Sequence, residues 1–290
     1  MSGNRPTYLR NDKYTGKKYF RGMKRLRRIM ARIFPALFAE MFRARGSREK
    51  YFHFLLGYLL PIVHAQAIYR FDNFLVLDCG PLMTPILKET LQRLEFQFEI
   101  VSPDQIEERF YVDAFDYVKG SSETIYSASE RVKSVWRDYV CTQHDCTFSA
   151  NLLIERSAPH KYYDKNGGSE KKGSGYGTSR RSITNWTEVC ETLDKRGIDY
   201  GLYEPGRHSL GCQIATFCRA RRIVGIRGAE WANIVWSQPD LHVRVVDPSP
   251  PATTLTNLLN HLNVNYEFII SEKNHTPVNP LVVARFLSES

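Results

Sequence analysis

Residues 222–236 place the strongest constraint on the fold of this chain. They begin with a short β-branched run at Ile223 and Val224, turn at Gly-Ile-Arg-Gly, and continue as a helix-like stretch that carries Glu230 and Asn233. A strand that leads through a glycine turn into a helix is typical of α/β proteins that hold phosphates and sugars at the edge of a sheet. An ordinary βα turn with a surface arginine is the alternative, because glycine turns are common in α/β folds.

The turn itself suits an anion. Gly225 and Gly228 permit backbone angles and close approaches that a side chain would block. The start of the following helix offers unpaired N–H groups and partial positive charge. Arg227 adds a permanent cation with a bidentate fork.

Strand-like and helix-like segments alternate along most of the chain. A strand at 74–78, a helix at 85–94 and a strand at 96–101 form a βαβ unit, which places Asp78 at the carboxyl end of its strand. Further helices are predicted at 50–66, 127–139, 185–196, 210–219 and 279–287, and further strands at 152–154, 223–224, 243–246 and 266–270. The polar, glycine-rich residues 160–179 are predicted to form a mobile loop.

This alternation predicts an α/β fold with two Rossmann-like domains that face each other across a cleft. The chain contains no Walker loop, and no Gly-x-Gly-x-x-Gly follows a strand. A basic arm with an amphipathic helix at 1–45 is expected to precede an N-terminal domain at 46–149. A C-terminal domain follows at 150–275, and a final helix at 276–290 packs back.

The positive charge of the chain is concentrated at its N-terminus. Residues 1–50 hold 15 Lys and Arg against three acidic residues, whereas the rest of the chain holds 25 basic and 28 acidic residues. Apolar residues at three-to-four spacing predict a basic amphipathic helix over 21–45. Residues 17–45 then suit an anionic membrane surface. Nucleic-acid binding and packing on the chain's own domain are the alternatives, although the acidic body argues against an extended nucleic-acid groove.

The six cysteines predict reduced, scattered thiols. None forms a Cys-x-x-Cys pair, and no histidine cluster has zinc-like spacing. The N-terminus has no apolar signal core, and the apolar residues 54–69 contain Pro61 and His64, which favours a buried helix over a membrane span. We therefore expect a cytoplasmic protein with peripheral membrane contact through its basic arm.

Five segments, taken together, are similar to the family 61 glycosyltransferases, which include plant xylosyltransferases and animal O-linked GlcNAc transferases. The segments are Leu-Ile-Glu-Arg at 153–156, Arg-Arg-Ser-Ile-Thr-Asn at 180–185, residues 209–213, residues 225–233, and His-Phe-Leu-Leu-Gly-Tyr-Leu-Leu-Pro at 53–61. The likeness is dense over 150–250 and thin elsewhere. Five segments in the same order are far more specific than one glycine turn.

The resemblance implies a GT-B fold and an inverting transfer from a UDP-sugar to a hydroxyl of a glycan or glycoconjugate. Xylose is the favoured sugar and GlcNAc the next. The donor belongs to the C-terminal domain and the acceptor to the N-terminal one. Because no Asp-x-Asp signature occurs, we expect no metal and no cofactor beside the donor. Arginines and helix N-termini would hold the departing diphosphate.

Carried over segment by segment, the resemblance implies a nucleotide-sugar site of nine residues. They are Arg156, Arg180, Arg181, Asn185, Arg227, Gly228, Ala229, Glu230 and Asn233. Arg227 stands where the family's usual residue is a histidine, and arginine can clamp phosphate but cannot act as a base. A membrane-surface scaffold that has lost catalysis is therefore a further alternative. Solvated or structural roles are the alternatives for Arg180, Arg181, Asn233 and the nearby Gln213.

An inverting transfer needs a base that deprotonates the acceptor hydroxyl. Asp78 ranks first because it ends a strand, although capping a helix is as common a role for such a residue. His53 and Glu230 are the other catalytic candidates, ahead of Asp113 and Asp116. The alternatives are a structural histidine at His53, and a helix-start cap or a contact with donor hydroxyls at Glu230.

Overall fold

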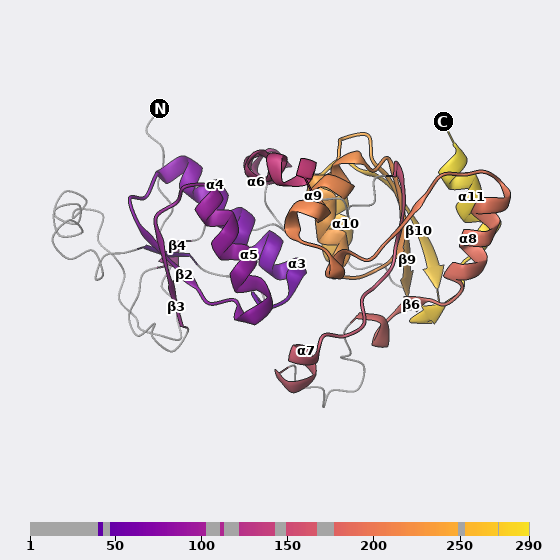
Figure 1. Ribbon diagram of the computed structural model, residues 1–290, viewed down its shortest axis with the longest axis horizontal. Coiled ribbons are helices and arrows are strands. Elements are labelled where there is room, and N and C mark those ends of the chain that lie inside the picture. Colours follow the sequence, from indigo (N-terminus) through magenta and orange to yellow (C-terminus); the bar gives the residue numbers. More distant parts are fainter. Residues whose placement is uncertain are drawn as a thin grey trace. The chain divides into compact units, whose positions relative to one another are not determined.

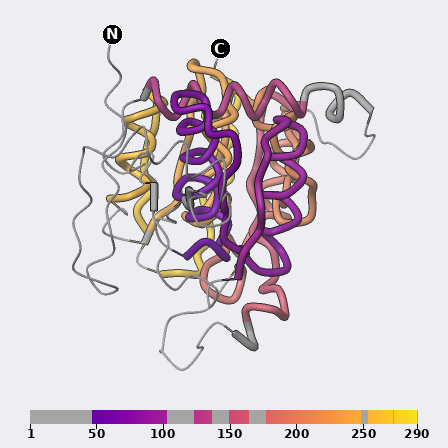
Figure 2. The backbone as a smooth tube through the Cα atoms, turned by 90° about the vertical axis from the view of Figure 1, so that its left-hand side faces the viewer, coloured from indigo at the N-terminus to yellow at the C-terminus, as the bar shows by residue number. Residues whose placement is uncertain are grey.

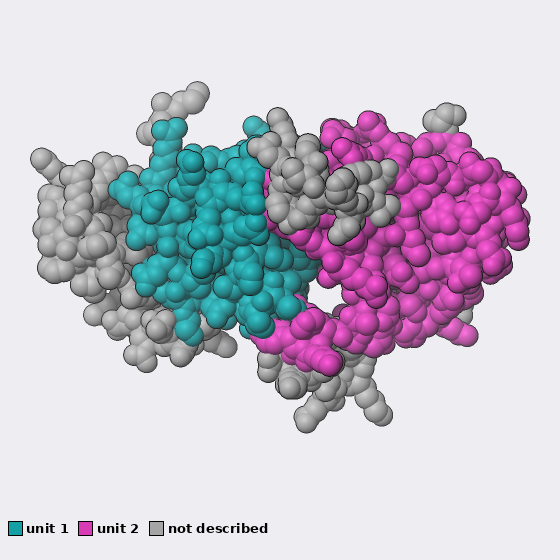
Figure 3. All heavy atoms as spheres, viewed as in Figure 1, with its two compact units in different colours: residues 1–135 teal, residues 136–290 magenta. Residues whose placement is uncertain are grey.

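The chain folds into two compact units, residues 1–135 and 136–290 (Figure 3). The structure is a computed structural model that describes residues 40–42, 47–102, 111–112, 122–142, 149–166, 177–248, 253–271 and 273–289. The remaining residues are drawn in grey (Figure 2). Each unit contains a parallel sheet, which confirms the α/β class. The predicted domain boundary between residues 149 and 150 follows the end of helix α6 (Ser122–Thr142).

The sheet of unit 1 has the strand order β3-β2-β1-β4, and all its pairs are parallel. Its strands are β1 (Glu40–Phe42), β2 (Phe74–Leu77), β3 (Phe98–Val101) and β4 (Tyr111–Val112). The prediction of a helix over 21–45 is therefore wrong for residues 40–42, because their backbone pairs with strands on both sides and tertiary pairing overrides helical periodicity. The rest of that predicted helix lies outside the described residues.

Residues 51–69 form one continuous helix, as predicted. It begins as α3 (Tyr51–Phe54), widens into the π-helix η2 (Leu55–Leu59) and continues as α4 (Leu60–Tyr69). This helix is long and apolar enough to cross a membrane, but 61% of its most apolar 18-residue stretch is buried inside the protein. The hydroxyl of Tyr58 accepts a hydrogen bond from the backbone N–H of Leu77, which joins the helix to β2. The burial is that of a core helix.

Two histidines of this helix are expected to make the folding stability of unit 1 fall as the pH is lowered. Burial lowers the pKa of His64, and burial together with the charge of Lys50 lowers the pKa of His53. The unfolded chain therefore binds more protons than the folded chain once the pH falls below about 6.5, and stability falls with pH in that window. We expect the His53→Gln/His64→Gln variant to show a smaller drop in melting temperature between pH 7.5 and pH 5.5 by calorimetry. An unchanged drop would contradict this assignment.

The sheet of unit 2 has the strand order β10-β9-β8-β5-β7, again with parallel pairs only. Its strands are β5 (Asn151–Ile154), β7 (Gly201–Tyr203), β8 (Arg222–Ile226), β9 (His242–Pro248) and β10 (Asn265–Ser271). Every strand predicted for this half is present, and the observed strands are longer by one to three residues. Because all five run the same way, their carboxyl ends meet at one edge.

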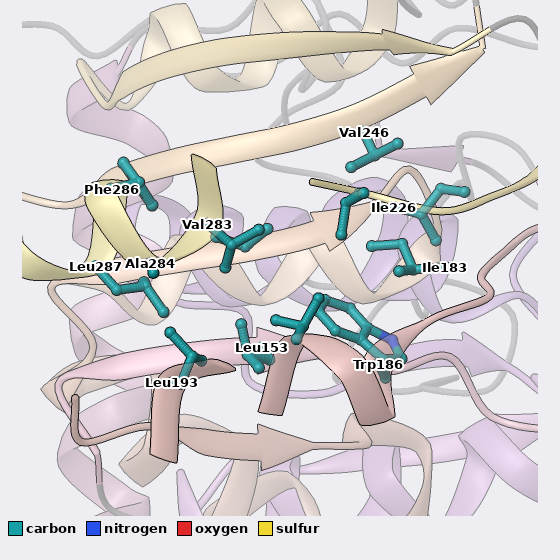
Figure 4. Close-up of a cluster of buried hydrophobic side chains, with 13 residues drawn as sticks. Leu153, Ile183, Trp186, Leu193, Ile226, Val246, Val283, Ala284, Phe286 and Leu287 are labelled. Atoms are coloured by element: carbon teal, nitrogen blue, oxygen red, sulfur yellow. The ribbon is translucent and has the colours of Figure 1, made fainter. Parts of the chain in front are cut away.

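Helices cover both faces of the unit 2 sheet (Figure 1). On one face lie α8 (Trp186–Lys195) and α11 (Pro280–Ser288), and on the other lie α9 (Leu210–Arg219) and α10 (Thr253–His261). Trp186 and Leu193 of α8 and Val283 of α11 pack with Leu153 and Val246 of the sheet in one buried cluster (Figure 4). The last helix therefore belongs to the core of unit 2.

The loop predicted at 160–179 is partly ordered. Helix α7 (Lys161–Asn166) and the 3-10 turn η4 (Gly177–Ser179) occupy its two ends, so the prediction of a mobile loop is wrong there. The residues between them lie outside the described part. Strand β6 (Ser182–Ile183) follows and pairs with β11 (His275–Thr276). The η4 end is held against the segment after β5, because Thr178 donates its backbone N–H to the carbonyl of Ser157.

Candidate functional site

The predicted site residues of unit 2 come together at the carboxyl edge of its sheet. In the pairing register, Ile154 of β5 lies opposite Gly225 of β8, and Ile226 lies opposite Val246 of β9. The residues that follow these strand ends are therefore neighbours. They include Arg156, Arg227, Gly228 and Asp247, of which Asp247 was not among the predicted site residues.

Arg156 and Glu230 form a buried ion pair at this edge. Arg156 Nε donates to Glu230 Oε1 over 3.3 Å, and the two side chains are only 7% and 13% exposed. The pair sits directly over Gly228, where an added Cβ would lie 2.0 Å from Glu230 Oε2 and 2.8 Å from Arg156 Nε. Gly228 thus leaves the space in which this pair approaches the backbone, as predicted, and a side chain there would make the ends of Glu230 and Arg156 move.

The backbone angles of the glycine turn are ordinary. Neither Gly225 nor Gly228 has a positive φ, and Gly228 is extended at φ −167°. The prediction that these glycines supply unusual backbone angles is therefore wrong, and what they supply is space. At Gly225 an added Cβ would lie 2.9 Å from Cβ of Ile154.

The segment after the turn is the 3-10 helix η6 (Ala229–Trp236), not the start of an α-helix as predicted. Asn233 lies within this helix, where its amide donates to the carbonyl of Glu230 and its oxygen accepts from Trp236 Nε1, three residues away on each side. The amide also donates to Gln213 Oε1 on α9. Asn233 is fully buried, so the structure gives it and Gln213 internal, structural positions.

Gly228→Ala tests whether this pair needs the space that glycine leaves. The added methyl would displace the carboxylate of Glu230 and the guanidinium of Arg156, so we expect loss of the thermal stabilisation by UDP that the predicted nucleotide-sugar site should give. Gly197→Ala is the matched control, because Gly197 has φ +62° and nothing within 4 Å of an added Cβ. That control should cost about 1 kcal/mol of stability and leave the UDP shift unchanged. Equal UDP shifts in both variants would refute the role of Gly228.

Arg227 pairs with the fully buried carboxylate of Asp247. Its backbone N–H donates to the carbonyl of Val246 over 2.8 Å, and its Nη1 lies 3.0 Å from Asp247 Oδ1. The Arg227 side chain is 20% exposed, whereas that of Asp247 has no exposed surface. Arg227 is therefore held in place both by its backbone bond to the sheet and by the buried carboxylate of Asp247.

Arg181 brings a third guanidinium to the same edge, and it is buried like that of Arg156. It follows η4 and is 8% exposed. Burial lowers its pKa to about 10, and the neighbouring charges of Arg227, Arg180 and Arg156 add to the effect, while Asp247 opposes it. The guanidinium stays protonated at neutral pH, so the folded chain holds several cations close together.

Several buried polar atoms of this cluster make no hydrogen bond. Four of them are Arg156 Nη1, Arg181 Nε, Ser157 Oγ and Glu230 Oε2, and Asp247 Oδ1 is a further one, although it lies 3.0 Å from Arg227 Nη1. A buried polar atom without a partner is costly, and charged ones are the most costly. Two of the four are cationic donors, which suits an anion with several acceptor oxygens. One is a carboxylate oxygen, which suits a hydroxyl donor.

Two residues of the site, Ser157 and Asp247, were not predicted from the sequence. Ser157 lies close to the backbone of Gly206, since a Cβ added at Gly206 would be 2.3 Å from Ser157 Oγ. Asp247 ends a strand, so the rule that selected Asp78 could also have selected it. No sequence signal marked Ser157, because its surroundings come from segments distant in the chain.

The other predicted donor-site residues differ in exposure. Arg180 is exposed next to Arg181, and Ala229 opens η6 with partial exposure. Asn185 is occupied within the fold, because its amide donates to the carbonyl of Val278 and to Glu188 Oε2, and its oxygen accepts from the N–H of Val278. Asn185 thus ties the start of α8 to the segment before α11.

The predicted base candidates of unit 1 have different surroundings. Asp78 Oδ1 accepts from the backbone N–H of Gly80 and from the hydroxyl of Thr84, so this carboxylate organises the start of α5 (Gly80–Arg93). His53 is half-buried on α3, and its lowered pKa keeps the imidazole neutral at pH 7. Asp113 and Asp116 lie outside the described residues.

Comparison with models of known protein families gives a match. The family model described as Glycosyltransferase 61 matches residues 51–244, which is more than half of the chain and includes parts of both units. A search of curated proteins found no match to the chain. The matched range contains Arg156, Arg181, Arg227 and Glu230, and it ends before Asp247.

Proposed function

The chain belongs to glycosyltransferase family 61 and is a glycosyltransferase, and we propose that it performs an inverting transfer from a UDP-sugar to a hydroxyl of a glycan or glycoconjugate. Xylose is the proposed sugar, with GlcNAc next. One observation carries the donor assignment, namely that Arg156 Nη1 and Arg181 Nε are buried donors without a hydrogen-bond partner at the carboxyl edge of a parallel sheet. A diphosphate supplies the acceptor oxygens that such guanidinium groups bind best.

The arginine cluster would stabilise the leaving group. Cleavage of the sugar–phosphate bond leaves UDP with an additional negative charge on its terminal phosphate. Fixed cations that are already in place at this atom stabilise the charge as it develops. Arg156, Arg181 and Arg227 are positioned for this role by burial and by ion pairs.

We propose that the transfer needs no resident metal. No group of three or more His, Cys, Asp or Glu side chains that could hold a metal ion occurs in the described part of the chain. Two buried arginines and the partly buried Arg227 provide positive charge at the proposed diphosphate position instead. A transfer assay with EDTA tests this point, and we expect activity to persist.

The acceptor is proposed to bind unit 1 in a GT-B-type arrangement. What supports this is that each unit has its own parallel sheet, with the buried arginines in unit 2. His53 is the better base of the two predicted in unit 1, because its imidazole is neutral at pH 7 whereas Asp78 Oδ1 is engaged by two donors. Glu230 remains a candidate for the base or for a contact with donor hydroxyls. Residues 17–39 remain a proposed contact with an anionic membrane at a cytoplasmic location, whereas residues 40–42 belong to the sheet of unit 1.

The test of this function combines binding and turnover. UDP at 100 times its dissociation constant should stabilise the protein by about 2.7 kcal/mol, whereas uridine should give little shift because it lacks the diphosphate. Release of UDP from UDP-xylose or UDP-GlcNAc should follow on addition of a glycan acceptor. A protein that no nucleoside diphosphate stabilises would contradict the donor assignment.

A further inference from the structure

Asp247 is a buried anion among the cations of the proposed donor site. Its side chain has no exposed surface and pairs with Arg227 at the end of β9. An ionised carboxylate with no access to solvent must be paired to be tolerated. Since it is fully buried behind Arg227, it is in no position to be a direct ligand of a bound nucleotide. Any effect of Asp247 on a bound nucleotide must therefore be exerted through the neighbouring arginines.

We propose that Asp247 is a positioning residue that fixes Arg227 and sets the net charge of the site, so that the site does not hold the product UDP too tightly relative to the donor. This inference rests on the proposed function. The buried Arg156 and Arg181 and the partly buried Arg227 face two paired carboxylates, Glu230 and Asp247. These five side chains carry one net positive charge, and the exposed Arg180 adds a further one beside them. Without Asp247 the net charge of the same cluster would rise by one.

The donor and the product differ in charge at this position. A terminal phosphate has a second pKa near 6, so the terminal phosphate of free UDP carries close to two charges at pH 7. The same phosphate in a sugar ester carries one. A more positive site would therefore strengthen the binding of UDP more than that of the donor. Asp247 limits that difference, which favours product release after transfer.

Asp247→Asn keeps the shape of the side chain and removes its charge. We expect titration calorimetry to show an increase of about 3- to 30-fold in the preference for UDP over its β-methyl ester, as one extra charge pair in a partly buried site would give. The methyl ester has the charge of the donor without any sugar contact. Asp240→Asn is the matched control, because Asp240 pairs with Arg221 at the exposed amino end of the same strands. That control should leave the preference unchanged.

Three outcomes separate the explanations. A preference that stays within twofold of the wild-type value in Asp247→Asn would overturn the charge-setting role. If that variant fails to fold, the Arg227→Gln/Asp247→Asn double variant restores the net charge, and we expect weaker binding of both ligands with the wild-type preference. A changed preference in the double variant would overturn the proposal. Failure of the wild-type protein to bind either ligand would refute the proposed donor site itself.

Discussion

Arg156→Ala is expected to lower the free energy of unfolding by about 3 kcal/mol, because removing one member of a buried ion pair leaves the other charge without compensation. The Glu230 carboxylate is 13% exposed and has Arg156 as its cationic partner. For a unit of this size the melting temperature should fall by about 6–12 °C. Binding of UDP should weaken about 100-fold, as loss of a charged hydrogen bond costs up to about 3 kcal/mol. Differential scanning calorimetry and UDP titration measure the two effects.

A double variant separates the two effects of Arg156. In Arg156→Met/Glu230→Gln no unpaired charge remains, so most of the lost stability should return while UDP binding stays weak. Arg207→Ala is the control, because Arg207 pairs with Glu204 but is itself 75% exposed. An exposed pair contributes about 0–1 kcal/mol. A double variant as unstable as Arg156→Ala would show that the damage comes from lost packing.

Arg181→Met should have opposite effects on stability and on binding. Burial and three neighbouring arginines lower the pKa of Arg181 to about 10, which means that the folded chain disfavours this charge. Methionine keeps much of the apolar stem and removes the charge, so we expect the ligand-free protein to gain about 1 kcal/mol, as other buried charges do when replaced by apolar groups. The UDP-dependent shift in melting temperature should largely disappear.

The control for Arg181 is an arginine at the other end of the sheet. Arg222→Met changes a partly exposed residue at the amino end of β8, and it should alter neither the ligand-free stability beyond about 0.5 kcal/mol nor the UDP shift. Simultaneous loss of stability and of UDP binding in Arg181→Met would mean that the guanidinium is a structural element of the fold. Unchanged UDP binding would remove Arg181 from the donor site.

Much of the site could be predicted from strand periodicity and from the rule that the carboxyl ends of parallel strands meet at one edge of a sheet. Once Arg156 and Arg227 were assigned to the ends of strands in one sheet, their proximity was a consequence of parallel direction. The role of Gly228 as a close-contact position was also predictable, because a glycine permits approaches that a side chain would block. These features depend on local pattern and on one general rule of α/β folds.

The remainder depended on contacts between distant segments. Asn233 was predicted to bind the donor, yet it is fully buried and its amide donates to Gln213 of α9, twenty residues away in the chain, and no local pattern specifies that partner. Asn185 was predicted to bind the donor, yet its amide is occupied by Val278, ninety-three residues away in the chain. Strand β1 was missed because helical spacing and parallel pairing compete, and long-range pairing decides between them.

The central claim is that the buried arginines of unit 2 hold the diphosphate of a nucleotide-sugar. A crystal structure of the protein with UDP tests it most directly. We predict diphosphate oxygens within about 2.9 Å of Arg156 Nη1 and of Arg181 Nε, as charge-assisted hydrogen bonds require, with Asp247 still paired to Arg227. UDP bound elsewhere on the protein, with these nitrogens still lacking partners, would contradict the account.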